Sequence, residues 1–134
     1  MPNTAAILRR AARLITNEGL HTGEQFAGTY TGLDICAAVY IAAESEFPTE
    51  FFNDEATSIA TIEASPTTIA AIKAISDALD SPACETAGQP DYIEHVSNWA
   101  STRGPGEENP PTANEVVGRI LRTADKADAH PNAA

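Results

Sequence analysis

Four side chains of the types that bind zinc stand far apart along the chain. They are His21, Cys36, Cys84 and His95. A structural zinc site usually contains ligand pairs separated by about two to four residues, and no two of these four are so close. We therefore expect no metal site and no bound cofactor. We interpret the histidines as surface residues and Cys36, which lies within an apolar run, as a buried thiol.

Carboxylates form the next group that could do chemistry. Glu46, Glu50 and Asp54 are spaced four apart and would share one face if their segment were helical, although like charges repel and Pro48 lies among them. Such side chains could hold a divalent cation, but no aspartate-rich calcium loop is present. We interpret them as a solvated acidic face, and the predicted interaction surface consists of Glu44, Glu46, Glu50, Asp54 and Glu55.

No catalytic residue is predicted from a motif. A nucleophile needs a base held beside it, and the chain contains no GxSxG elbow and no local context typical of a catalytic cysteine. The segment Gly104-Pro105-Gly106 lacks the lysine and hydroxyl of a phosphate-binding loop. The cluster Arg9, Arg10 and Arg13 could hold a phosphate, but we expect these arginines to pair with the protein's own carboxylates.

A ligand pocket is an alternative that the sequence leaves open. Its candidate residues are the aromatic, histidine and carboxylate side chains His21, Tyr30, Glu44, His95 and Trp99. Trp99, the single tryptophan, precedes a proline-rich loop. It is interpreted as a core anchor for that loop, with a stacking or interface role as the alternative.

The formal net charge of -11 is spread unevenly along the 134 residues. No lysine or arginine occurs from Leu14 to Ile72, whereas nine carboxylates do. The phosphate backbone of a nucleic acid would be repelled by this stretch, so we expect no direct nucleic-acid binding. A basic protein partner fits the charge, and solubility alone is the alternative reason for it.

Cysteine content and hydropathy indicate a cytoplasmic protein. Two cysteines cannot form the dense disulfide framework of a small secreted domain. Arginines interrupt the first apolar stretch, which is unlike a signal peptide. The longest apolar run, LDICAAVYIAA, has 11 residues, against the roughly 20 needed to cross a bilayer. We expect a soluble protein without a membrane segment.

The elements that must position these residues are helices. Hydrophobic spacing and capping signals predict a mainly α, single-domain bundle of about five helices, with a glycine-rich loop after the first. We expect one helical domain over residues 1–126 and a frayed or disordered tail over 127–134. The predicted helices begin at a Thr4 cap, near Leu33, at Ser65-Pro66 with Ser65 as the cap, at Pro90, and at a Thr112–Glu115 capping box, while 54–64 fits a helix only in part.

Three stretches together resemble a known family. They are LRRAARLITNEGLHTG, the apolar LDICAAVYIAA, and VSNWASTRGPGEENPPTANEVVGRILRTAD near the end. The chain resembles a family of short proteins from actinobacteria and their phages, classed as a domain of unknown function. The segment from about Phe47 to Ala64 is least alike, and the family commonly has an aromatic residue where Leu20 stands. The resemblance implies a helical fold and brings no activity, cofactor or catalytic residue.

Three hypotheses about function follow. The leading one is a non-enzymatic cytoplasmic interaction or regulatory protein, of bacterial or phage origin, that acts through the acidic surface. The second is a small enzyme or ligand-binding protein that uses the pocket residues named above. The third is an oligomeric structural or assembly protein in which exposed Phe51 and Phe52 form the contact between copies.

Overall fold

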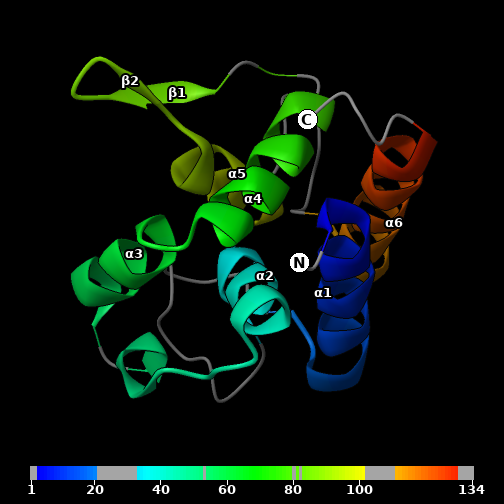
Figure 1. Cartoon of the computed structure of the whole chain (residues 1–134), viewed down its shortest axis with the longest axis horizontal. Coiled ribbons are helices and arrows are strands. Elements are labelled where there is room, and N and C mark those ends of the chain that lie inside the picture. The colour runs from blue at the N-terminus through cyan, green and yellow to red at the C-terminus, as the bar shows by residue number, and fades with distance from the viewer. Residues whose placement is uncertain are drawn as a thin grey trace.

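The computed structural model describes residues 3–20, 33–52, 54–79, 81, 83–101 and 111–129. Within these ranges the chain is mainly helical, as predicted, with six α-helices, one short 3-10 helix and one small antiparallel hairpin (Figure 1). The elements are α1 (Thr4–Glu18), α2 (Ile35–Glu44), η2 (Thr49–Phe52), α3 (Glu55–Glu63), α4 (Pro66–Ala78), β1 (Cys84–Thr86), β2 (Gln89–Asp91), α5 (Tyr92–Ser101) and α6 (Ala113–Ala129). The predicted glycine-rich loop covers residues 20–32, of which all but Leu20 lie outside the described residues, and α6 continues three residues into the predicted tail.

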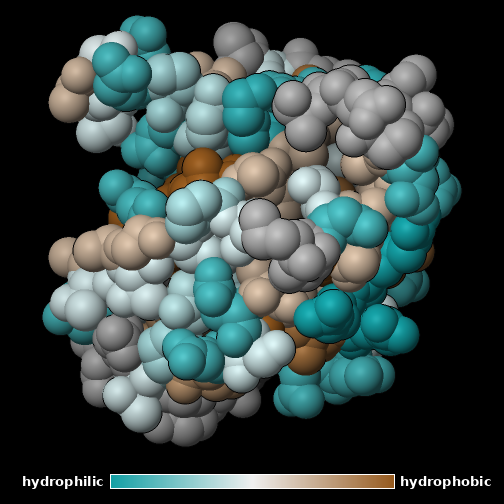
Figure 2. Space-filling view, viewed as in Figure 1, coloured by the Kyte–Doolittle hydropathy of each residue, from teal (hydrophilic) through white to brown (hydrophobic). Residues whose placement is uncertain are grey.

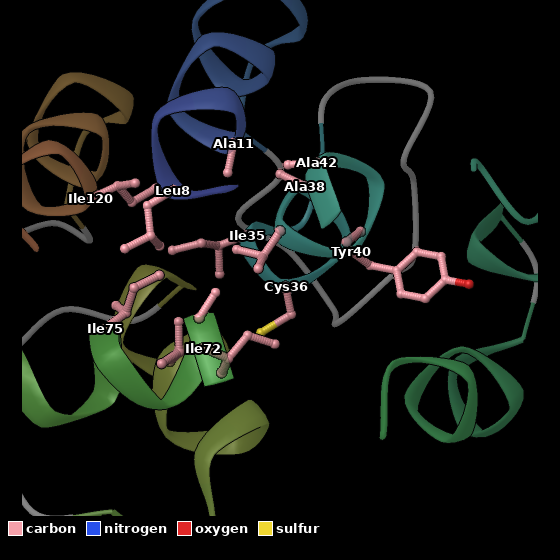
Figure 3. Packing of buried hydrophobic residues seen from close by; sticks show 14 of the residues in the cluster. Leu8, Ala11, Ile35, Cys36, Ala38, Tyr40, Ala42, Ile72, Ile75 and Ile120 are labelled. Carbon is pink, nitrogen blue, oxygen red and sulfur yellow. The ribbon is translucent and has the colours of Figure 1, made fainter. Parts of the chain in front are cut away.

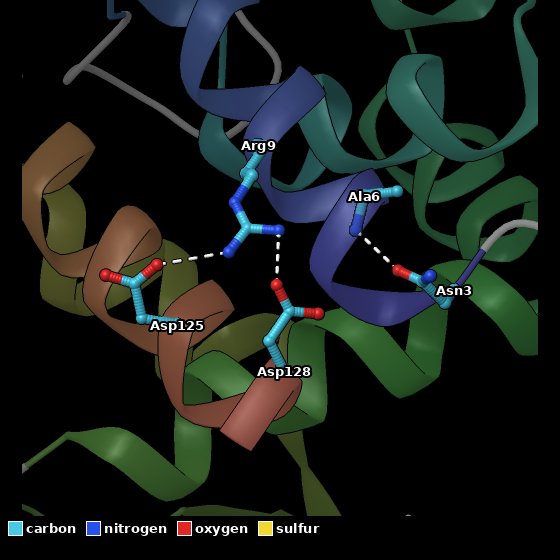
Figure 4. Close-up of polar contacts among 5 residues, drawn as sticks. All are labelled: Asn3, Ala6, Arg9, Asp125 and Asp128. Atoms are coloured by element: carbon cyan, nitrogen blue, oxygen red, sulfur yellow. Dashed lines mark hydrogen bonds and ion pairs between the residues drawn. The ribbon is translucent and has the colours of Figure 1, made fainter. Parts of the chain in front are cut away.

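Side-chain caps fix the start of each of the first three α-helices. Asn3, and not the predicted Thr4, caps α1, because its side-chain oxygen accepts from the Ala6 amide at 2.7 Å (Figure 4). Asp34 caps α2 and is itself buried. Asp54 caps α3. Each cap gives an acceptor to an amide that has no partner inside its helix.

The starts of α4 and α6 confirm the predicted signals. Ser65 caps α4 with Pro66 in its first turn. Thr112 and Glu115 form the capping box of α6, since the Glu115 amide donates to the Thr112 hydroxyl at 3.2 Å and the Glu115 carboxylate accepts from Thr112. These signals involve residues no more than three apart, which is why the sequence alone reveals them.

Pro90, the predicted start of a helix, lies instead in the second strand of a β-hairpin. β1 pairs with β2 so that Thr86 lies opposite Gln89, and the two turn residues, Ala87 and Gly88, both have positive φ. Paired positive φ values match the twist of a two-residue hairpin. The helix begins two residues later than predicted, because Asp91 accepts a hydrogen bond from the Glu94 amide and so defines the first turn of α5.

α2 is the centre of the core. Its residues Ile35 to Tyr40 are buried all round, as the continuous apolar run predicted. Side chains from α1, α4 and α6, among them Leu8, Ile72 and Ile120, pack into the same cluster (Figure 3). α1 contacts both α2 and α6, which places α6, at the end of the chain, beside the first helix.

Phe51 belongs to this core, and its predicted exposure is wrong. The side chain is fully buried, and its ring meets the ring of Tyr40 edge-on at 5.5 Å between centroids. The short η2 helix turns Phe51 inward, and burial of an aromatic ring in a core with few large side chains favours that geometry. Phe51 therefore has no surface for a contact between copies. The side chain of Phe52 lies outside what the structure describes.

Candidate functional site

One polar cluster in the described part of the chain is centred on His95 in α5. The Nδ1 atom of His95 lies 2.6 Å from the Ser76 hydroxyl of α4. The Nε2 atom lies 2.8 Å from the hydroxyl of Ser81, which follows α4. Ser76 is buried and Ser81 is exposed, so the ring connects the interior to the surface. A hydroxyl, an imidazole and a second hydroxyl in line resemble the order of nucleophile, base and orienting group.

The interpretation of His95 as a surface residue is wrong, since the residue is 7% exposed. The cap at Asp91 sets the rotation of α5, which turns Ile93, Val96 and Ala100 into the core and places His95 against the end of α4. Burial of an imidazole is tolerated when both nitrogens find partners. Those partners stand 19 and 14 residues away in sequence, so no local motif announced Ser76 or Ser81.

Cys36 is the buried thiol that the sequence predicted. Its sulfur accepts from the Ser97 hydroxyl at 3.3 Å and lies 3.7 Å from the Ile93 carbonyl oxygen. Burial, followed by the nearby charge of Asp34, raises the pKa of the Cys36 thiol well above its usual range. The sulfur therefore stays protonated and packs as a small hydrophobic group, without the thiolate character of a nucleophile.

Glu44 lies at the other end of α4 from His95. Its carboxylate accepts hydrogen bonds from the cap residue Ser65 and, at 3.4 Å, from Thr67. Ser65 and Ser76 are eleven residues apart on α4, which corresponds to about 16 Å at the rise of an α-helix. The structure therefore places Glu44 and His95 at separate sites and gives Glu44 a role in holding the start of α4.

The other predicted pocket residues are Trp99, His21 and Tyr30, and within the described ranges none of them is hydrogen-bonded to Glu44 or His95. Trp99 is half-buried and packs against the hydrophobic core, which is compatible with an anchor. His21 and Tyr30 lie outside the described residues.

The predicted acidic surface is split between several elements. Glu46 lies exposed after α2, whereas Asp54 caps α3. The amide and then the hydroxyl of Thr57 lower the pKa of Asp54 from its usual value. Because η2 and α3 are separate helices, Glu46, Glu50 and Asp54 do not share one helix face. The side chains of Glu50 and Glu55 are outside the described part of the structure.

An exposed aromatic residue lies within this acidic stretch. Phe47 is 44% exposed, and its ring centroid lies 6.2 Å from that of buried Phe51. The space-filling view shows hydrophilic residues over much of the face that it presents, with the most hydrophobic residues visible in recesses of that face (Figure 2). Phe47 is one of two large hydrophobic side chains, with Leu121, that are exposed among the described residues.

Arginines from the two end helices contact other parts of the fold. Arg9 of α1 forms ion pairs with Asp125 at 3.1 Å and Asp128 at 2.7 Å on α6 (Figure 4). For Arg9 the expectation of pairing with the protein's own carboxylates is confirmed. All three side chains are partly or largely exposed, so the pairs add little stability.

Two further arginines donate hydrogen bonds to carbonyls at the C-terminal ends of other helices, and neither of those helices has a basic residue in its own last turn. Arg10 donates to the Ala42 carbonyl of α2 at 2.9 Å, and Arg119 donates to the Ala78 carbonyl of α4 at 3.0 Å. A cation near the C-terminus of a helix interacts favourably with the helix dipole and with carbonyls that lack partners. These contacts give a structural reason for the concentration of arginine in the first and last helices.

Comparison with known proteins places the chain in a family. A model of the Family of unknown function (DUF6197) matches residues 1–126. The chain belongs to this family. Neither the curated proteins nor the solved structures contain a significant match to it. The resemblance drawn from the sequence is thus confirmed as membership of a domain family of unknown function.

Within its described ranges, this family member has neither a cluster of metal ligands nor a membrane-spanning helix. No group of three or more histidine, cysteine, aspartate or glutamate side chains is arranged to hold a metal ion there. No helix within the described ranges is long and apolar enough to span a bilayer.

Proposed function

We propose that this protein is a cytoplasmic interaction or regulatory protein, of bacterial or phage origin, that binds a basic protein partner through an acidic surface. The surface is the part of the predicted acidic surface that holds no helix start, Glu46, Glu50 and Glu55, because Glu44 and Asp54 of the predicted set bind at the starts of α4 and α3. The observation that carries the proposal is an imbalance between the two signs of charge: most of the described cations are engaged within the protein, while many carboxylates face solvent.

The cations supply one half of this argument. Of the eight lysines and arginines of the chain, seven lie in the described ranges, and four of those seven have an intramolecular partner there. Arg9 and Lys73 form ion pairs, and Arg10 and Arg119 donate to helix ends. The positive potential of a cation paired with a carboxylate is largely offset by that partner.

Carboxylates supply the other half. Within the described part of the chain, Glu46 of the proposed surface is exposed and forms no ion pair, and the same holds for Glu63, Glu85 and Glu94 on other elements, which add to the general negative charge. Such a surface attracts a basic partner over a distance of about 8–10 Å at ordinary ionic strength and speeds its association. Phe47, exposed beside Glu46, adds an aromatic group of the kind that contributes strongly when it is buried in an interface.

The test compares two triple substitutions with the same change in net charge. The first, Glu46→Gln with Glu50→Gln and Glu55→Gln, neutralises the proposed surface and leaves the structural carboxylates Glu44 and Asp54 unchanged. The control, Glu18→Gln with Glu85→Gln and Glu94→Gln, neutralises three exposed carboxylates elsewhere. Each protein is used to capture partners from a bacterial lysate at low and at high salt, with cross-linking and mass spectrometry.

We expect a basic protein to be captured at low salt, released at high salt, lost with the first triple variant and retained with the control. Capture of nothing at low salt would overturn the proposal. Equal loss with both variants would also contradict it, because the effect would then depend on net charge and not on a particular surface.

A further inference from the structure

We propose that Ser81 and His95 form a nucleophilic site, in which Ser81 accepts an acyl group from a small activated ester and His95 acts as the general base. The proposal does not depend on the acidic surface. It rests on the line of Ser81, His95 and Ser76, whose two hydrogen bonds measure 2.8 Å and 2.6 Å. A general base must lie within about 2.6–3.2 Å of the oxygen whose proton it takes.

The two serines differ in their exposure to solvent, and therefore in the role that each can play. Ser81 is exposed, so an ester in solution can reach its Oγ atom, whereas Ser76 and His95 are buried. Ser81 is therefore the nucleophile, and Ser76, whose hydroxyl lies 2.6 Å from Nδ1 of the ring, is a positioning residue. The buried ring is held between α4 and α5, which fixes its orientation toward Ser81.

The tautomer of His95 decides whether the ring can act as a base. A neutral imidazole has one donor nitrogen and one acceptor nitrogen. Nε2 can take the Ser81 proton only if Nδ1 carries the ring hydrogen and donates it to Ser76. The Ser76 hydroxyl must then turn its own hydrogen elsewhere. Inside a helix it can donate to the carbonyl four residues earlier, as Thr16, Ser58 and Thr123 do in this chain.

The proposed step is a balanced acyl transfer. The Oγ atom of Ser81 attacks the ester carbonyl carbon while its proton passes to Nε2 of His95. The tetrahedral intermediate then breaks its bond to the leaving alkoxide or phenoxide, which takes the proton from Nε2. The products are an ester on Ser81 and a free alcohol or phenol. No oxidant, metal or other co-reactant is required.

The first experiment treats the intact protein with p-nitrophenyl acetate and locates acetyl groups by peptide mass spectrometry. Ser45, exposed at the end of α2, is the reference hydroxyl. General-base assistance is worth about 100-fold or more, so we expect Ser81 to be acetylated at least about 100-fold faster than Ser45. Ser81→Ala removes this adduct, and His95→Gln lowers acetylation of Ser81 to the rate of Ser45. Equal rates at Ser81 and Ser45 in the unchanged protein would overturn the proposal.

The second experiment remains decisive even if His95→Gln fails to fold. Nitrogen-15 NMR of the histidine ring in the unchanged protein reports which nitrogen carries the hydrogen in the neutral form. We expect Nδ1–H, with a shift toward Nε2–H in Ser76→Ala, because that variant lacks the acceptor for Nδ1. If Nε2 carries the hydrogen in the unchanged protein, His95 donates to Ser81 and cannot be its base.

Discussion

Replacement of the buried cap Asp34 by alanine tests whether a buried helix cap contributes more to the free energy of unfolding than an exposed one. The Asp34 side chain accepts from the amides of Cys36 at 2.8 Å and Ala37 at 3.3 Å, at the start of the central helix α2. Asp34 is 2% exposed, so water cannot readily replace it. Asp54 plays the same role at α3 but is exposed, which makes Asp54→Ala the matched control.

The magnitude follows from two contributions. Loss of a cap costs about 1 kcal/mol. A buried donor left without an acceptor costs about 1–3 kcal/mol more, and this second contribution applies to the buried amides at Asp34 but not to those at Asp54. We therefore expect Asp34→Ala to lower the free energy of unfolding by about 2–4 kcal/mol and Asp54→Ala by about 1 kcal/mol.

Equilibrium urea unfolding, followed by circular dichroism, measures both values at pH 7. Asp34→Asn is the third variant, because its amide oxygen can still accept the two hydrogen bonds and should recover part of the loss. If the two alanine variants lose the same free energy of unfolding, within about 0.5 kcal/mol, burial does not increase the contribution of the α2 cap and the reasoning is refuted.

Three other outcomes are expected. Phe51→Ala should lower the free energy of unfolding by about 3–5 kcal/mol, whereas Phe47→Ala, at an exposed site, should change it by less than about 1 kcal/mol. Denaturant melts measure both values, and similar losses would contradict the core placement of Phe51. In a Cys84→Ser variant, Cys36 should react with a thiol reagent only after the protein unfolds, because burial raises the pKa of Cys36 and blocks access; rapid reaction in the native state would argue against this packing. The pKa of Asp54 is lower in the folded protein than in the unfolded chain. The ionised Asp54 therefore stabilises the fold above the usual aspartate pKa of about 3.9. This stabilisation is lost as the pH falls through the lower pKa of the folded protein. Thus the stability difference between the unchanged protein and Asp54→Asn should shrink in acid, and a difference independent of pH in melts would be the contrary result.

Local sequence patterns predicted most of the helices because their signals are local. The pair Ser65-Pro66, the box at Thr112 and Glu115, and the apolar run of α2 each involve residues within one or a few turns. The hairpin from Cys84 to Asp91 was missed for the opposite reason. Its strands have only three residues each, too few to show an alternating pattern, and its turn contains an alanine at positive φ.

The candidate site depended on contacts between distant residues. His95 was identified by type alone and was expected at the surface, and its hydroxyl partners Ser76 and Ser81 carry no local motif. Glu44 was grouped with His95 by chemical type, yet it binds at the start of α4 while His95 binds at its end. Residue type shows which chemistry is available, but the packing of α4 against α5 decides which groups meet.

Composition and local spacing by themselves determined a mainly helical, acidic chain with a buried Cys36 and arginines gathered in its first and last helices. Only the tertiary structure decided what those arginines do, that Phe51 faces the core, and that a buried histidine lies between two hydroxyls. The physical reason is the range of the interactions. Capping and helical periodicity act over a few residues, whereas the partners of Arg9, Arg119 and His95 are separated from them by between 14 and 119 residues.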